Sequence, residues 1–271
     1  MWFALALFLI AAVTWFAFVK CYTEGYEPGR EPLSKVWLEA EEQKDDLDTV
    51  GVGRTSPFVT AMCITRERVP LLTRSARCFL DQTYPAKELL IVYDSDDKET
   101  AKFHALNKEP SIRFLVSHKR KTLGELRNLA VQEANGDFVI QWDDDDEYHP
   151  DRIHYQLRHS ILEGRKASTL ERWMISDDVT GRKYVSHARK RQGTEAGWEG
   201  TILAPRKLLL DVPYPSMKRG EDSVVTQELC RRDMISTMCM PHLYTYHLHG
   251  RNTYEREHGL RIIKDATPID N

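Results

Sequence analysis

Four consecutive aspartates, Asp143 to Asp146, are the residues of this sequence with the clearest chemical potential. They follow a short apolar segment, Phe138 to Trp142, and Pro150 comes soon after at a position that suits the first turn of a helix. Four adjacent carboxylates cannot be buried as a core, because each ionised group is costly to desolvate. A solvated acidic turn is one interpretation. The run follows a predicted strand, however, at the edge where α/β sheets bind ligands, so we favour a site for Mg²⁺ or Mn²⁺ carrying a phosphate.

The elements that must position this run alternate between strand and helix. Apolar segments predict strands at 58–65, 88–93, 112–116 and 138–142. Helical spacing lies between them, and Thr122 with Glu125 forms a predicted capping box. Continuous apolar strands separated by helices indicate a parallel sheet covered on both faces. The sequence therefore predicts an α/β fold, Rossmann-like, with a mostly parallel sheet flanked by helices.

Composition narrows the possible partners. The chain has 271 residues, a formal net charge of −3 and 29% charged residues, so no basic field attracts nucleic acid. Two short basic stretches, 118–121 and 187–191, lack an aromatic stacking pattern and are interpreted as solvated loops. The five cysteines are odd in number and contain no CxxC pair, which excludes a disulfide framework or a zinc signature.

The chain begins with an apolar run over residues 2–19 in which Thr14 is the polar member. Its length reaches the lower limit for a membrane-spanning helix, so we expect a transmembrane anchor at 1–19 and a single-pass membrane protein. A cleavable signal peptide is the rival interpretation, but no basic region precedes the run and no small-x-small site precedes Lys20. Basic residues follow the run, which places the main domain in the cytoplasm, with the Golgi or ER lumen as the alternative.

Residues 20–55 read as a stalk and linker. Ser34 can cap a short helix that extends through Leu47, and the acids along this helix predict a solvated face. We expect the main domain to span 56–253 and a C-terminal tail to occupy 254–271.

Five motifs in order carry a resemblance to a known family. They are Gln82–Pro85 leading into Glu88–Asp94, Arg127-Asn128, Asn135–Asp137, Trp142–Asp146 and Pro150-Asp151. Together they resemble inverting family-2 glycosyltransferases of the GT-A fold. The resemblance implies a GT-A domain over 56–253, a nucleotide-sugar donor, and Mn²⁺ or Mg²⁺ as cofactor. The sequence departs from the family pattern at Tyr93 and at 61–65, where the family has an acid and a proline-containing motif.

The resemblance also implies roles on the donor side. Asp94 would accept a hydrogen bond from the nucleobase, although a turn or cap aspartate is the alternative. Arg127 would bind the diphosphate through its planar fork, or pair with a surface acid. Asp143 and Asp144 would contact the donor, and Asp145 would hold the metal. Because the register of four aspartates slips easily, Asp144 stays open as a metal ligand.

The later motifs imply the remaining roles. Asp222, in Arg219-Gly220-Glu221-Asp222, would be the general base, and Glu221 would contact the acceptor; both could also cap the following helix. In the segment 246–253, His249 matches the family's metal-binding histidine best, with His247 as the alternative. Trp198 would line the acceptor pocket or belong to the core.

These observations predict a metal-dependent, inverting glycosyltransferase that uses a UDP-sugar. The acceptor hydroxyl would belong to a carbohydrate, glycolipid or glycoprotein. Two alternatives remain, namely a catalytically inactive sugar-nucleotide or carbohydrate-binding module and a metal-dependent nucleotidyltransferase.

Overall fold

The structure is a computed structural model that describes residues 33–48, 56–164, 166–188, 190–191, 194–195, 197–250, 252 and 256–269. The anchor expected at 1–19 lies outside these residues, as do the first part of the stalk and the linker at 49–55. Among the described helices, none combines the length and the apolar character that a membrane crossing requires.

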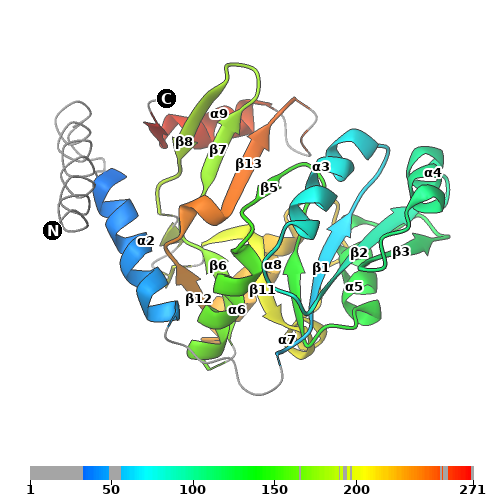
Figure 1. Cartoon of the computed structure of the whole chain (residues 1–271), viewed down its shortest axis with the longest axis horizontal. Helices are drawn as coiled ribbons and strands as arrows, with labels where there is room; N and C mark the ends of the chain where they lie inside the picture. Colours follow the sequence, from blue (N-terminus) through cyan, green and yellow to red (C-terminus); the bar gives the residue numbers. More distant parts are fainter. Residues whose placement is uncertain are drawn as a thin grey trace, which may run out of the picture.

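A seven-stranded sheet forms the centre of the molecule (Figure 1). Its strands in spatial order are β12 (Ile235–Met238), β6 (Ala167–Leu170), β11 (Trp198–Pro205), β4 (Phe138–Gln141), β1 (Val59–Ile64), β2 (Lys87–Asp94) and β3 (Ile112–Ser117). The pairs β1–β2, β1–β4, β2–β3 and β6–β12 are parallel, whereas β11 runs antiparallel to both of its neighbours. The mostly parallel α/β sheet predicted from the sequence is therefore confirmed.

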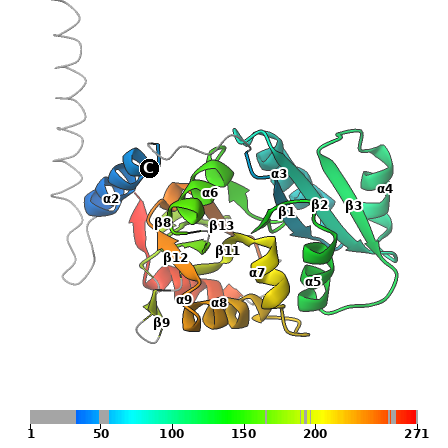
Figure 2. The ribbon, with the colours of Figure 1, turned by 90° about the horizontal axis from the view of Figure 1, so that it is seen from below.

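Helices cover both faces of this sheet, because successive side chains of its buried strands point to opposite sides. On one face α3 (Val69–Leu80) and α6 (Arg152–Leu162) contribute to a first hydrophobic cluster, and α4 (Lys98–Leu106) packs at its margin. On the other face α5 (Leu123–Glu133), α7 (Arg206–Asp211) and α8 (Glu221–Arg231) contribute to a second (Figure 2). The predicted capping box is present at the start of α5.

A second sheet lies beside the carboxyl end of β4 (Figure 1). It contains β14 (Thr267–Ile269), β8 (Arg182–Val185), β7 (Met174–Asp177), β13 (Tyr244–Leu248) and β5 (Glu147–Tyr148). The short pair β9 (Lys190–Arg191) and β10 (Thr194–Glu195) and the turn η1 (Pro241–Leu243) complete the described elements around it. Because β5 directly follows the four aspartates and pairs with β13, this sheet fixes one side of the acidic turn.

Within the segment 254–271, expected as a tail, the described residues 256–269 pack on the folded domain. β14 pairs antiparallel with β8, and the preceding helix α9 (Arg256–Lys264) packs closely on β13. A Cβ at Gly259 of α9 would lie 2.2 Å from Cδ2 of Leu248, so glycine permits this close approach. This packing has no local signal in the chain, because it depends on a strand pairing between distant residues.

The helix predicted from Ser34 through Leu47 is confirmed as α2 (Leu33–Asp48). It is not a detached stalk, however, because Val36 and Leu47 are 2% and 1% exposed against the domain. The backbone N–H of Cys239 donates to Oε1 of Gln43 at 2.6 Å. Most of the acids of α2 face solvent as predicted, and its apolar side is docked.

Candidate active site

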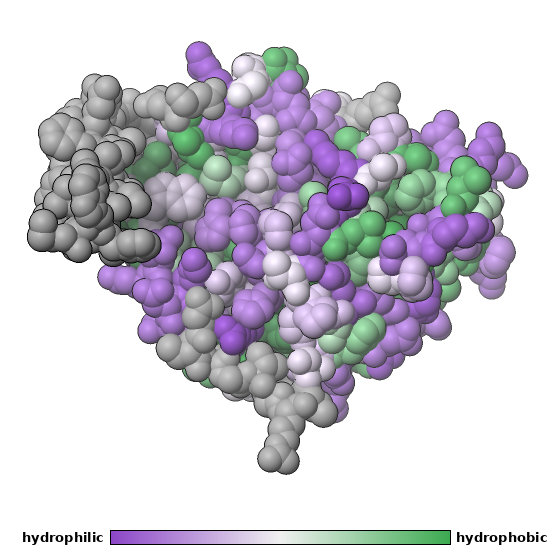
Figure 3. Space-filling view, in the orientation of Figure 1, coloured by the Kyte–Doolittle hydropathy of each residue, from purple (hydrophilic) through white to green (hydrophobic). Residues whose placement is uncertain are grey.

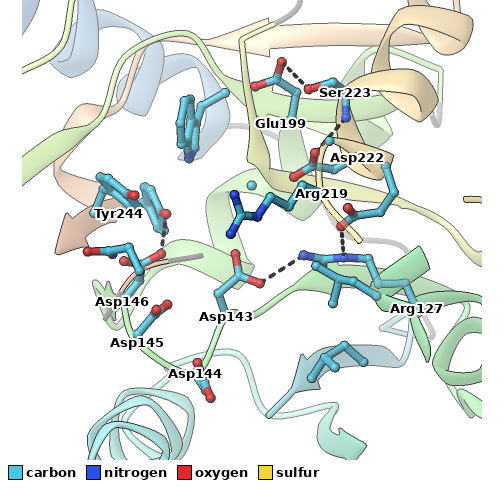
Figure 4. Close-up of a pocket in the computed structure, with 18 of the residues that line it drawn as sticks. Arg127, Asp143, Asp144, Asp145, Asp146, Glu199, Arg219, Asp222, Ser223 and Tyr244 are labelled. Atoms are coloured by element: carbon cyan, nitrogen blue, oxygen red, sulfur yellow. Dashed lines mark hydrogen bonds and ion pairs between the residues drawn. The ribbon is translucent and has the colours of Figure 1, made fainter. Parts of the chain in front are cut away.

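A cavity of about 200 Å³ opens beside the acidic turn between β4 and β5 (Figure 4). Its walls come from the aspartate turn 143–146, the segment 198–200 of β11 and the segment 219–223 that leads into α8. Side chains from β13 and α9 close the remaining side. Most of the predicted site residues therefore meet in one place, although they come from segments that are far apart in the sequence.

Asp144 points out of the turn toward the loop after β1. Its carboxylate accepts hydrogen bonds from Oγ1 of Thr65 at 2.6 Å and from Nη1 of Arg68 at 3.2 Å. Burial and the neighbouring Asp145 raise the pKa of Asp144 to about 7, although Arg68 and Thr65 act against this rise. Asp144 is therefore held by Thr65 and Arg68 while it also borders the cavity.

Asp146 is the most deeply buried member of the turn, at 1% exposed. It accepts a hydrogen bond from the hydroxyl of Tyr244 at 2.5 Å and another from the backbone N–H of His247 at 3.0 Å. Burial raises the pKa of Asp146 well above its ordinary value, with the charges of Asp145 and Asp143 adding to the effect. Asp146 therefore ties the turn to β13.

Asp143 and Glu221 of α8 both contact the buried guanidinium of Arg127. Nη2 of Arg127 lies 3.3 Å from Oδ1 of Asp143, and Nε of the same guanidinium donates to Oε1 of Glu221 at 2.8 Å. Gln141 holds the other carboxylate oxygen of Asp143 at 3.0 Å. Arg127 is 4% exposed, and these acids raise its pKa against the opposing effect of burial. Both Arg127 and Glu221 border the cavity, but their charges are first of all directed at each other.

Asp145 of the turn contacts His249, the residue that follows the end of β13. Nε2 of His249 lies 3.2 Å from Oδ2 of Asp145, and Nη1 of Arg68 reaches the same oxygen at 2.9 Å. Burial acts to raise the pKa of Asp145, but the hydrogen bond to His249 and the charge of Arg68 outweigh it, and the net shift is downward. Asp145 is therefore held as a carboxylate next to an imidazole.

His247 is turned away from this pair. Its Nδ1 lies 2.8 Å from Oδ1 of Asp178, and its Nε2 lies 3.3 Å from Oε2 of Glu147. β13 ends at Leu248, so His249 leaves the strand and reaches Asp145, which His247 cannot do. Of the two histidines that the sequence left open, His249 is the one that contacts Asp145.

The Asp145–His249 pair fits a divalent cation. Two ligands set at right angles around an ion with bonds of about 2.1 Å lie about 3 Å apart, close to the observed 3.2 Å between these two atoms. Carboxylate oxygen and imidazole nitrogen together suit Mn²⁺ better than Mg²⁺. Within the described part of the chain, no three acidic, histidine or cysteine side chains converge as a complete cage. An ion here would need further oxygen ligands from a diphosphate or from water.

Asp222 stands across the cavity from the aspartate turn (Figure 4). Burial raises the pKa of Asp222 to about 6, with Arg127 acting in the opposite direction and Glu221 and Glu199 adding to the rise. Its Oδ1 accepts a hydrogen bond from the backbone N–H of Ser223 at 2.7 Å. Gly220 before the helix has a φ of +74°, a left-handed conformation that favours glycine and turns the chain so that Asp222 faces the cavity.

Trp198 packs in the core and also borders the cavity. Its ring stacks on Trp173 with centroids 4.5 Å apart and planes at 27°, as a core residue does. The same side chain also lines the cavity, next to the ring of Tyr246 at 5.7 Å. Trp198 therefore offers a rigid apolar surface on the side where an acceptor would lie.

Asp94 lies outside the lining of this cavity. It ends β2, where Nη1 of Arg66 donates to its Oδ2 at 2.6 Å. The side chain is 14% exposed, and its Oδ1 is buried without a hydrogen-bond partner. The position at a strand's carboxyl end agrees with the expectation, and the observed contact is an ion pair.

Among the cavity-lining side chains that sequence reasoning missed are the charged or titratable residues Arg68, Glu199, Arg219 and His258. Arg219 stands inside the motif 219–222 noted above and Glu199 directly follows Trp198, and their charge at these positions is a signal that could have found them. His258 belongs to α9, beyond the expected domain boundary. Its place in the site follows only from the packing of α9 on β13.

The mixed sheet with an acidic turn at its edge, facing a carboxylate at a helix start, defines an α/β protein of the GT-A type. Residues 61–217 match the family described as glycosyl transferase family 2, and the chain belongs to this family. The resemblance read from the motifs is thereby confirmed.

Solved structures with the same fold include the 1–349 fragment of Staphylococcus aureus TarS in complex with UDP-GlcNAc, with a TM-score of 0.57 at 16% identity. That match covers 74% of this chain and 60% of the other. A second is the mannosyltransferase PcManGT of Pyrobaculum calidifontis in complex with GDP-Man and Mn²⁺, with a TM-score of 0.56 at 15% identity, covering 88% of this chain and 74% of the other. At such identities the likeness shows the fold alone.

A curated relative is WcaA of Escherichia coli K12, named as a glycosyl transferase of colanic acid biosynthesis. It is 26% identical over 108 residues. The matched region spans 39% of this chain and 39% of WcaA.

Proposed function

We propose that this protein is an inverting, metal-dependent glycosyltransferase that moves a sugar from a nucleotide-sugar, a UDP-sugar, to an acceptor hydroxyl. The observation that carries the proposal is that Asp222, with a pKa of about 6, faces the Asp143–Asp146 turn across one cavity. A carboxylate that is ionised at neutral pH, yet retains basicity, is suited to accept a proton from an alcohol.

In the proposed reaction Asp222 accepts the proton of the acceptor hydroxyl as that oxygen attacks the anomeric carbon of the donor sugar. The new carbon–oxygen bond forms as the bond to the diphosphate breaks, and the nucleoside diphosphate leaves with the bonding electrons. Because Asp222 and the aspartate turn lie on opposite sides of the cavity, attack comes from the face opposite the leaving group (Figure 4). The anomeric configuration is thereby inverted.

Asp145 and His249 would hold the divalent cation, Mn²⁺ or Mg²⁺. When bound, such an ion supplies positive charge that neutralises the diphosphate as negative charge develops on it. Arg68 and Arg219 border the same space and add protein charge on the diphosphate side. Asp143 and Asp144 would contact the donor near its ribose, while Asp94 would accept from the nucleobase.

The donor class is supported by the two similar structures, which contain UDP-GlcNAc and GDP-Man. Trp198 would pack against the acceptor sugar, and Glu221 would contact the acceptor while it also holds the guanidinium of Arg127, which would bind the diphosphate. We propose a carbohydrate, glycolipid or glycoprotein as acceptor. A single-pass membrane anchor at residues 1–19, with the catalytic domain in the cytoplasm rather than in the Golgi or ER lumen, is part of the same proposal.

The test is to incubate the full chain with a panel of UDP- and GDP-sugars and Mn²⁺, and to identify the leaving group. A nucleoside diphosphate is expected, whereas pyrophosphate would indicate a nucleotidyltransferase. D145N and D222N should each abolish turnover while the melting temperature stays close to that of the wild type. Tight donor binding by calorimetry without turnover in any wild-type reaction would instead support a sugar-nucleotide-binding module.

A further inference from the structure

Arg152 is a fully buried cation directly behind the aspartate turn. It stands at the start of α6, and its side chain is 0% exposed. Its Nε donates to Oε1 of Gln156 at 2.9 Å, and its Nη2 donates to the carbonyl of Thr201 at 3.3 Å. Both acceptors are neutral. Among the residues that the structure describes, no carboxylate pairs with this guanidinium, and Nη1 has no hydrogen-bond partner.

Three aromatic rings take the place of a counterion. The central carbon of the guanidinium lies 4.7 Å from the ring centre of Tyr148, 5.4 Å from that of Trp142 and 5.5 Å from that of Tyr244. The face of each ring carries partial negative charge, which attracts a cation. Without such compensation a buried charge is strongly destabilising, so a cation kept here requires a physical reason.

Two of these rings, those of Tyr148 and Tyr244, contact the aspartate turn through their hydroxyl groups. The hydroxyl of Tyr148 donates to the backbone carbonyl of Asp143 at 2.9 Å, and that of Tyr244 donates to the carboxylate of Asp146 at 2.5 Å. A cation on a phenol face withdraws electron density from the ring, which makes the hydroxyl a stronger hydrogen-bond donor. The turn places four carboxylates, Asp143 to Asp146, next to one another, and like charges repel in a space with little water.

We infer that Arg152 is a positioning residue whose charge, acting through Tyr148 and Tyr244, stabilises the aspartate turn in the shape that presents Asp145 for a divalent cation. The inference goes beyond the proposed function, and the measurement of Mn²⁺ binding that tests it rests on that function. Arg152 does not line the cavity, whereas Tyr244, whose ring faces its guanidinium, does.

Two variants separate the charge of Arg152 from its shape. R152K keeps the charge and loses the fork, whereas R152M loses both, and each loses the hydrogen bonds to Gln156 and Thr201. The Mn²⁺ dissociation constant, measured by electron paramagnetic resonance of the free ion, should rise tenfold or more in R152M and stay within about threefold of the wild type in R152K. R206M is the control, because Arg206 is an arginine that likewise donates to backbone carbonyls, although it is only half-buried, and it lies away from the turn.

Amide hydrogen exchange over residues 143–148 supplies a readout that needs no metal. Exchange should be faster in R152M than in R152K, and R206M should match the wild type there. In a double-mutant cycle, R152M should add little to the effect of Y244F, since both changes act on the same path. If R152M is too unstable to purify, the pair R152K and Y244F decides the point, with Y244F alone expected to weaken Mn²⁺ binding and speed exchange.

Equal losses in R152K and R152M, or an unchanged turn in both, would overturn the inference and leave Arg152 a packing residue. If the wild type binds no Mn²⁺, the metal dependence of the proposed function fails. The exchange comparison then still decides whether the charge of Arg152 stabilises the turn.

Discussion

Nε of Arg127 lies 2.8 Å from Oε1 of Glu221, although the two residues stand 94 positions apart. Their side chains are 5% and 2% exposed, so this is a buried ion pair. It joins α5 to the first turn of α8, and Asp222 is the next residue after Glu221. Because the same guanidinium also reaches Asp143, the pair fixes the distance between the aspartate turn and the candidate base.

Replacement of Arg127 should therefore lower the free energy of unfolding. R127M leaves Glu221 as a buried charge without compensation, and we expect a loss of about 3–5 kcal/mol in the free energy of unfolding, measured by urea denaturation. K207M breaks the exposed pair between Lys207 and Asp211 and should cost less than about 1 kcal/mol. A loss in R127M as small as that in K207M would show that the buried pair does not hold the site together.

The activity should depend on pH through Asp222. Since the pKa of Asp222 is raised to about 6, the carboxylate that accepts the proton predominates above that pH. We expect kcat/KM to fall tenfold for each unit below about pH 6 and to level off above it, apart from effects of the metal ligands. A rate that stays constant from pH 7 to pH 5 would exclude Asp222 as the base.

The same group links stability to pH. The pKa of Asp222 is higher in the folded protein than its ordinary value of 3.8, so the folded state retains the proton to higher pH than the unfolded chain does. This stabilisation is complete below the ordinary pKa and is lost as the pH rises through about 6. D222N should accordingly become more stable relative to the wild type as the pH rises from 4 to 8, by up to a few degrees in melting temperature.

His249 and His247 should differ in their effect on the metal. H249A removes the imidazole next to Asp145, and the Mn²⁺ dissociation constant should rise tenfold or more, as measured by calorimetry. H247A keeps the backbone N–H that donates to Asp146, and its side chain faces Asp178, so affinity should change by less than about threefold. The reverse order would assign the ligand to His247.

The docking of α2 can be tested with two leucines of the same helix. Leu47 is 1% exposed and Leu38 is 51% exposed. L47A should lower the free energy of unfolding by about 2–5 kcal/mol, because a buried leucine leaves a cavity. L38A should change it by no more than about 0.5 kcal/mol. Similar values for both variants would show that α2 is not part of the cooperative unit.

Much of the fold could be predicted because it is encoded in local patterns. The apolar runs at 58–65, 88–93, 112–116 and 138–142 became β1, β2, β3 and β4, and the alternation with helices fixed their parallel direction. The antiparallel insertion of β11 and the second sheet were not predictable in this way. Their pairings join residues far apart, and short strands with polar residues carry a weak signal.

The candidate site likewise has features that the sequence predicts and features that depend on tertiary contacts. By itself the sequence determined which residue types were present, namely a run of four aspartates after a strand, an aspartate opening a later helix and two histidines near the end. Tertiary structure alone decided which aspartate meets which partner, that His249 rather than His247 reaches Asp145, and that α2 and α9 pack on the domain. The physical reason is that the type and order of residues are properties of the chain, whereas a carboxylate's contacts and pKa depend on neighbours that only folding brings within a few ångströms.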